Sequence, residues 1–131
     1  MKILSVAVPC YNSQEYMRKC VDSLLKGGED VEILIVDDGS KDDTLKIARD
    51  YEEKYPTIVK AIHQENKGHG GAVNTGLAHA TGLYFKVVDS DDWVAEDMFE
   101  SMYLAAVESD ADICVCDAVE CREDGSRTYL P

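Results

Sequence analysis

Three features of the sequence predict an α/β fold with a mainly parallel sheet and helices on both faces. Short, continuously apolar runs occur along the chain, as in strands that are buried on both sides. Segments with apolar residues at helical spacing separate these runs, which is the alternation of βαβ units. Polar residues follow directly after several of the runs, and ligands bind at the carboxyl ends of parallel strands.

The predicted strands are the apolar runs themselves, which cover residues 3–8, 31–36, 58–62, 83–88 and 113–119. Beyond the last run, the turn-like segment Glu123–Ser126 lies between two short apolar flanks. These flanks, at 119–121 and 128–130, favour a hairpin.

Helices are expected between successive strands, and local capping signals place the starts of the first two. Asn12 is the expected N-cap of the first helix, with Glu15 three residues later, and Gly27 ends this helix. Ser40 and Asp43 resemble a capping box for the second helix. A third helix is predicted over 72–80, after a polar, Gly-rich loop at 64–71, and a fourth over about 96–106.

Composition and charge exclude several function classes. Lys and Arg number 13 against 26 Asp and Glu, so the net charge is −13, and no basic run is present to contact nucleic-acid phosphates. The hydrophobic share of 45% argues against a disordered acidic tail. No apolar run is long enough to cross a membrane, and the first residues do not resemble a secretory signal. The odd number of Cys, 5, favours reduced thiols and a cytoplasmic location.

The strongest candidate site is the acidic segment Asp89-Ser90-Asp91-Asp92, directly after an apolar run. Its carboxylates repel one another unless a cation lies among them, and Mg²⁺ or Mn²⁺ prefers such oxygen ligands. The alternative is an acidic loop that caps the following helix through Asp92 or Glu96.

Two further strand ends carry residues that suit a nucleotide. Asp37 and Asp38 follow the second run, and one of these carboxylates could accept the imide N–H of a uracil base; the alternative is a helix-capping turn. Tyr11 follows Pro9 after the first run and could stack on a base, or pack locally.

The Gly-rich loop adds a third candidate. Its glycines permit close approach of the backbone, and the N-terminus of the following helix favours a phosphate. Lys67 or His69 could add a hydrogen-bond donor, although an exposed loop residue is the alternative for His69.

Several known motifs are absent. The dinucleotide fingerprint fails because Val73 stands where a third Gly is needed, and no P-loop pattern occurs. Residues 89–100 have the length of a calcium loop, but Val94 stands where that loop requires Gly.

Taken in this order, the motifs resemble those of the family 2 glycosyltransferases with the GT-A fold, a Rossmann-like fold. The resemblance covers roughly residues 3–110. The matching stretches are Val6–Asn12, Glu32–Thr44, Asn66–Gly76, Ala80–Tyr84 and Asp89–Trp93.

The resemblance implies a role for each matching residue. The residues expected to bind the nucleotide are Pro9, Tyr11, Asn12, Asp37, Asp38, Lys67, Gly68, His69, Asp89 and Ser90. Tyr11 is expected near the uracil ring and Asp38 at the base. Asp91 and Asp89 are expected to hold a divalent cation, Mn²⁺ or Mg²⁺, with Asp92 as a second candidate.

The resemblance further implies inverting transfer of a sugar from a nucleotide diphosphate, with UDP favoured, to a carbohydrate or lipid-carrier hydroxyl. We expect residues 1–131 to be the donor-binding part of a truncated GT-A domain, with the catalytic base beyond Pro131. Such a chain would bind donor without full activity, and bacterial polysaccharide biosynthesis is the expected setting. The alternative is a non-catalytic UDP- or metal-binding module.

Overall fold

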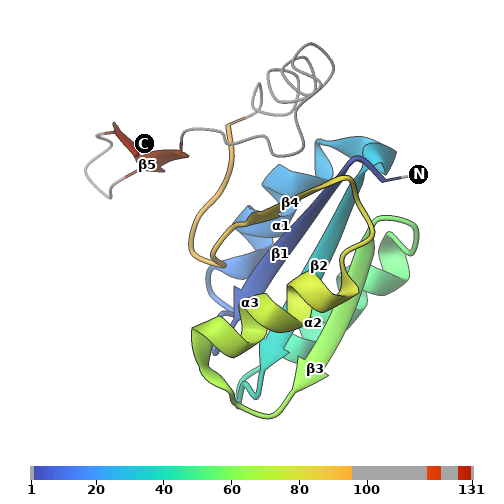
Figure 1. The fold of residues 1–131 in the computed structure, drawn as a ribbon. Helices are drawn as coiled ribbons and strands as arrows, with labels where there is room; N and C mark the ends of the chain where they lie inside the picture. The colour runs from blue at the N-terminus through green and yellow to red at the C-terminus, as the bar shows by residue number, and fades with distance from the viewer. Residues whose placement is uncertain (1, 96–117, 122–126, 131) are drawn as a thin grey trace. The chain divides into compact units, whose positions relative to one another are not determined.

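A parallel sheet of four strands forms the centre of the first of two compact units, Met1–Trp93 (Figure 1). The computed structural model describes residues 2–95, 118–121 and 127–130. The strand order is β3-β2-β1-β4, and every neighbouring pair is parallel. The strands are β1 Leu4–Cys10, β2 Val31–Asp38, β3 Val59–Gln64 and β4 Tyr84–Val87.

Helices cover both faces of this sheet, as predicted (Figure 1). One face carries α1 and α2, and the opposite face carries α3. The helical elements of this unit are α1 Met17–Leu25, the short 3₁₀ helix η1 Gly28–Asp30, α2 Thr44–Lys54 and α3 Gly68–His79. On α3, Gly76 allows close packing, because a Cβ added there would lie 2.6 Å from the Cβ of Ala7 on β1.

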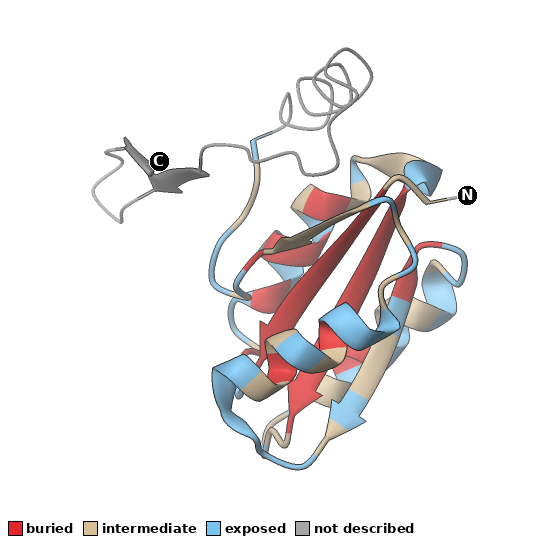
Figure 2. Cartoon of the chain, in the orientation of Figure 1, coloured by how far each residue is buried: buried red, intermediate tan, exposed pale blue. Residues whose placement is uncertain are grey.

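The core lies along β1 and β2, in which every residue is buried (Figure 2). This explains why their sequences are apolar without alternation, since both faces of a central parallel strand are covered. On α1 the buried residues are Met17, Cys20, Val21 and Leu24, whose helical spacing places them on one face against the sheet.

β2 also buries three carboxylates, those of Glu32, Asp37 and Asp38. Glu32 on β2 is 2% exposed and accepts hydrogen bonds from Ser5 Oγ, Lys60 Nζ and both the backbone N–H and the hydroxyl of Thr81. Burial alone would raise the pKa of Glu32, but these donors outweigh it and lower the pKa below its usual value. The network joins β1, β2, β3 and the segment before β4.

The predicted capping of the first two helices is wrong. Helix α1 begins at Met17, and Asn12 lies before it with a left-handed φ of 49°. Helix α2 begins at Thr44 after Asp43, so Ser40 is not its N-cap. The cause is tertiary: the N–H of Asn12 donates to Ser40 Oγ, and the N–H of Lys41 donates to Asn12 Oδ1. Each polar side chain therefore binds the other loop instead of its own helix.

Helix α3 begins earlier than predicted. The segment 68–71, expected as loop, forms its first turn, and the helix ends at His79. Asp38 explains the shift, because its carboxylate accepts the N–H groups of Lys67 and Gly68 at the start of the helix.

The second compact unit, Val94–Pro131, contains the predicted hairpin. Strands β5 Ala118–Cys121 and β6 Arg127–Leu130 pair antiparallel. The end of the predicted strand 113–119 lies in β5, and its other residues, 113–117, lie outside the described residues. So does the predicted helix over about 96–106. No helix among the described residues is long and apolar enough to span a membrane.

Candidate functional site

The carboxyl ends of β1, β2 and β4 meet at one edge of the sheet. Cys10 pairs with Asp37 in the register of β1 and β2, and Ala7 pairs with Val87 in that of β1 and β4. The segments that follow β1 and β4, together with His69 of α3, line a pocket of about 310 Å³ at this edge. Its lining residues are Pro9, Tyr11, Asn12, Ser13, Tyr16, His69, Asp89, Ser90 and Asp91.

Most of the sequence-predicted site residues therefore come together in this pocket. The predicted residues that do not line it are Asp37, Asp38, Lys67, Gly68 and the second cation candidate, Asp92. Two lining residues, Ser13 and Tyr16, were not predicted. Tyr16 is 55% exposed, and an exposed aromatic residue just before the apolar face of α1 is a signal that could have indicated it.

Asp38 is directed at the start of α3. Its Oδ1 accepts Gln64 Nε2 at 2.9 Å and the N–H of Lys67 at 2.7 Å, and its Oδ2 accepts the N–H of Gly68 at 3.0 Å. Burial would raise the pKa of Asp38, but these bonds outweigh it and lower the pKa below its usual value. The carboxylate is thus held ionised, and it positions the helix that carries His69.

Asp37 is equally buried and stabilises the turn after β2. Its Oδ1 accepts the N–H of Ser40 at 3.2 Å, and its Oδ2 lies 2.8 Å from His63 Nδ1 at the end of β3. Both hydrogen bonds hold backbone segments near the pocket in place.

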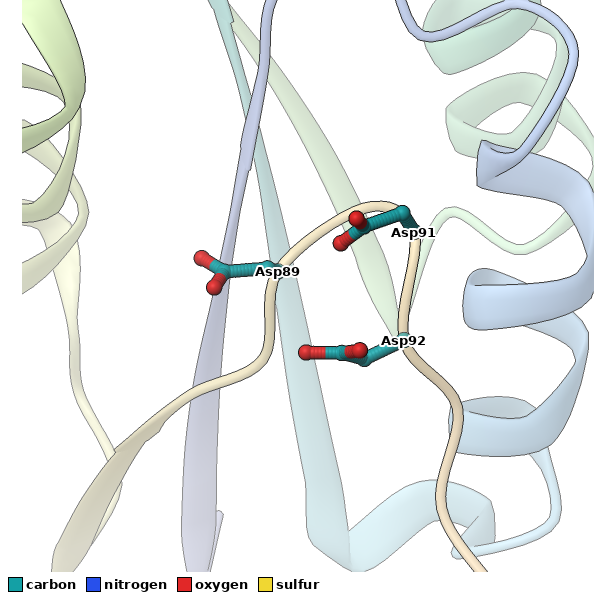
Figure 3. Close-up of side chains that lie close together, drawn as sticks. All are labelled: Asp89, Asp91 and Asp92. Carbon is teal, nitrogen blue, oxygen red and sulfur yellow. The ribbon is translucent and has the colours of Figure 1, made fainter. Parts of the chain in front are cut away.

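The acidic turn follows β4. Asp89, Asp91 and Asp92 each offer an oxygen within 4.8 Å of the others, and Figure 3 shows their carboxylates around this turn. The N–H of Asp92 donates to the carbonyl of Asp89 at 2.9 Å, which closes the turn. Clustered carboxylate oxygens are the donor set that Mg²⁺ and Mn²⁺ prefer, so these residues fit a hard divalent cation.

His69 connects α3 to the acidic turn. Its Nε2 lies 2.7 Å from Asp89 Oδ1, and both side chains are largely open to solvent. One oxygen of Asp89 therefore has a hydrogen-bond partner on α3, and both residues line the pocket.

A cation–π contact lies at the exit of the acidic turn. Lys19 Nζ of α1 is 3.6 Å from the ring centroid of Trp93. This contact ties the residue after Asp92 to the first helix, so the turn is held at its exit as well as at Asp89.

Comparison with known proteins assigns the family. The model of Glycosyl transferase family 2 matches residues 5–131. The uncharacterized glycosyltransferase YibD of Escherichia coli is 39% identical over 127 residues, which are 96% of this chain and 37% of that protein. A poly(ribitol-phosphate) beta-glucosyltransferase of Bacillus spizizenii is 38% identical over 117 residues, 86% of this chain and 18% of its own length.

Solved structures agree with this assignment. TarS 1-349 of S. aureus in complex with UDP has a TM-score of 0.73 and 32% identity, covering 82% of this chain and 32% of that one. A mannosyltransferase of Pyrobaculum calidifontis in complex with GDP-Man and Mn²⁺ has a TM-score of 0.65 and 30% identity, covering 72% and 29%. The chain thus spans well under half the length of these relatives. It belongs to glycosyl transferase family 2, as the N-terminal part of the family's GT-A-like fold.

Proposed function

We propose that this chain holds the donor site of an inverting glycosyltransferase and binds a UDP-sugar in the pocket at the carboxyl edge of its sheet. One observation carries the proposal: a single pocket is lined by an exposed aromatic side chain, Tyr11, and by two carboxylates of the acidic turn, Asp89 and Asp91. An aromatic face suits a nucleobase, and carboxylates suit a cation that accompanies a diphosphate.

In this proposal, different residues of the pocket bind different parts of the nucleotide. Tyr11 is 46% exposed, so its ring is open for stacking on the uracil base beside Pro9 and Asn12. Asp91 and Asp89 would hold the cation, with Asp92 within reach of the same position. A bound divalent cation supplies positive charge that stabilises a departing nucleoside diphosphate.

Four of the predicted residues support the nucleotide site indirectly in this proposal, by holding the backbone around the pocket in place: Asp37, Asp38, Lys67 and Gly68. Asp38 accepts the N–H groups of Lys67 and Gly68 and so sets the position of His69 in the pocket. Direct contact of Asp38 with the base, which the resemblance implies, would require a carboxylate that already accepts three hydrogen bonds to accept another.

Complexes of relatives support the choice of donor. TarS 1-349 has been solved with UDP and with UDP-GlcNAc, and the Pyrobaculum calidifontis mannosyltransferase with GDP-Man and Mn²⁺. We therefore favour UDP over GDP as the nucleotide of the donor. The acceptor in this proposal is a hydroxyl of a bacterial polysaccharide, wall polymer or lipid carrier, and the catalytic base lies outside residues 1–131. The free thiols of Cys10 and Cys20 agree with a cytoplasmic location.

Calorimetric titration with UDP, with and without Mn²⁺, tests the donor site. We expect binding that depends on Mn²⁺, and we expect Asp91→Asn to abolish that dependence while the fold survives. Asp50→Asn, an exposed aspartate of α2 away from the pocket, is the matched control and should bind like the wild type. Binding of UDP that ignores Mn²⁺ and Asp91 would contradict the proposed cation site, and equal binding of UDP, GDP and ADP would contradict selection for uracil.

A sugar-transfer assay distinguishes a glycosyltransferase from the alternative, a non-catalytic UDP- or metal-binding module. A longer protein that contains this chain should release UDP from a UDP-sugar when an acceptor is supplied. Tight, Mn²⁺-dependent binding of UDP without any transfer by that longer protein, across a panel of UDP-sugars and acceptors, would favour a non-catalytic UDP-binding module.

A further inference from the structure

Two loops of the pocket meet at a pair of serine hydroxyls. Ser13 belongs to the loop after β1, two residues beyond Tyr11, and Ser90 lies between Asp89 and Asp91 in the acidic turn. Their Oγ atoms are 2.8 Å apart, and either hydroxyl can be the donor. Both residues line the pocket, yet Ser13 is only 4% exposed, so its hydroxyl lies mostly beneath the pocket surface.

Ser13 is fixed from several directions. Its Oγ accepts the N–H of Tyr11 at 3.1 Å, and its own N–H donates to Thr44 Oγ1 at 2.8 Å. Thr44 in turn begins α2. The Ser13 hydroxyl thus contacts both Ser90 and the backbone of Tyr11, and the other contacts leave Ser13 little freedom. A displacement of Ser90 would therefore change the position of the Tyr11 backbone.

The partly buried surroundings of this pair favour a strong hydrogen bond between the two hydroxyls. Cys10, at the end of β1, is a buried neighbour of both hydroxyls, and its thiol donates to the carbonyl oxygen of Val8. Burial, aided by the negative charge of Asp37, raises the pKa of the Cys10 thiol to about 12, so the thiol stays neutral. A hydrogen bond in such a partly buried setting has few competing water molecules.

We propose that the Ser13–Ser90 hydroxyl pair couples the two halves of the donor pocket, so that a cation at the acidic turn strengthens binding of the nucleobase beside Tyr11. The inference rests on the proposed function, because it assigns the aromatic side to a base and the acidic side to a cation. A cation offsets repulsion among the carboxylates and orders the turn, and this order passes through Ser90 to the loop that carries Tyr11. The effect is reciprocal, as coupling between binding sites must be.

Uridine is the probe that isolates this effect. It lacks the diphosphate through which UDP would bridge to the metal, and the serine variants below separate an influence of the cation that passes through the protein from a direct contact with the ribose. NMR titration with uridine, with and without diamagnetic Mg²⁺, measures a coupling factor. We expect Mg²⁺ to tighten uridine binding by about fivefold, the effect of one neutral hydrogen bond.

Four variants test the path. Ser13→Ala and Ser90→Ala should each reduce the coupling factor to near one, and the double variant should lose no more than either single variant. Ser90→Thr keeps a hydroxyl and should retain the coupling. Because Ser90 is not fully buried, its variants stay informative even if Ser13→Ala impairs folding, which thermal unfolding would reveal.

Ser40→Ala is the matched control. It removes a hydroxyl that accepts the N–H of Asn12 in the same loop as Ser13, whereas the hydroxyl that Ser90 meets is that of Ser13. Uridine affinity should fall equally with and without Mg²⁺, leaving the coupling factor unchanged.

The outcomes separate this inference from the proposed function. Absence of Mn²⁺-dependent UDP binding by the wild type would overturn the proposed function. With that binding intact, uridine affinity that ignores Mg²⁺ would overturn the coupling alone. So would coupling that survives in Ser13→Ala and Ser90→Ala, or that is lost equally in Ser40→Ala.

Discussion

Replacing Asp38 with Asn tests whether this carboxylate organises the start of α3. The change keeps the size of the side chain but leaves one accepting oxygen instead of two. In the better of its two orientations, the amide oxygen still faces Gln64 Nε2 and the N–H of Lys67. The amide nitrogen then faces the N–H of Gly68, where Oδ2 had accepted at 3.0 Å, so two donors oppose each other.

The magnitude follows from these contacts. An unsatisfied N–H costs about 1–3 kcal/mol, and the lower part of this range applies because Gly68 is exposed and water can reach it. Loss of a negative charge at a helix N-terminus costs a further ~0.3–1 kcal/mol. We expect the free energy of unfolding to fall by about 2 kcal/mol at neutral pH.

Urea unfolding at several pH values provides the assay. The pKa of Asp38 is lowered in the folded state, so its contribution is complete above the unfolded value of about 3.9 and is lost as the pH falls through the folded value. The gap between wild type and Asp38→Asn should therefore be constant near neutral pH and narrow below about pH 4. Asp43→Asn is the matched control, because Asp43 precedes α2 without any side-chain capping bond.

Two results would refute this reasoning. The first is a loss of less than about 0.5 kcal/mol for Asp38→Asn, below what an opposed pair of donors permits. The second is an equal loss for Asp43→Asn, which would mean that the charge alone matters and the hydrogen bonds do not.

Three further changes probe the core, the packing of α3 and the pocket. Glu32→Gln should lower the free energy of unfolding by about 1–2 kcal/mol, and the ion pair contributes little of this because Lys60 is half exposed. Because the pKa of Glu32 is lowered in the folded state, the difference in stability between wild type and variant should narrow below about pH 4 in urea unfolding. A difference that does not depend on pH would contradict this. Gly76→Ala should destabilise the protein by roughly 1 kcal/mol, since overpacking against Ala7 exceeds the gain in helix propensity. Gly70→Ala should instead stabilise α3, because no atom lies within 4 Å of the added Cβ. Thermal unfolding in which both variants shift the melting temperature in the same direction would refute this reasoning. Tyr11→Ala should weaken UDP by about 1–3 kcal/mol in calorimetry if its ring stacks on the base, and a much smaller loss would exclude stacking.

The alternation of strands and helices was predictable because it follows from burial. A strand covered on both faces is mostly apolar, and β1 and β2 are buried at every position. The α/β fold class, predicted from this alternation, and the family, predicted from the order of the motifs, are both confirmed. The order of the strands was not predicted, since it depends on pairings such as Ala7 with Val87 that join distant parts of the chain.

Helix starts were less predictable because capping signals are local and weak. Asn12 and Ser40 are good N-caps in isolation, but each finds its partner in the other's loop. Only the parallel pairing of β1 with β2 brings those two loops together, so the competing hydrogen bonds do not exist until the sheet forms.

The site shows the same division. Residue type and position after a strand were enough to indicate an acidic, cation-compatible turn at Asp89–Asp92 and an aromatic group at Tyr11, because parallel strands deliver their carboxyl ends to one edge. The direction of each side chain was not in the pattern. Asp38 faces the start of α3, and Ser13 faces Ser90, across 77 positions of sequence. Such contacts depend on the distance and angle between packed elements, which no local sequence signal encodes.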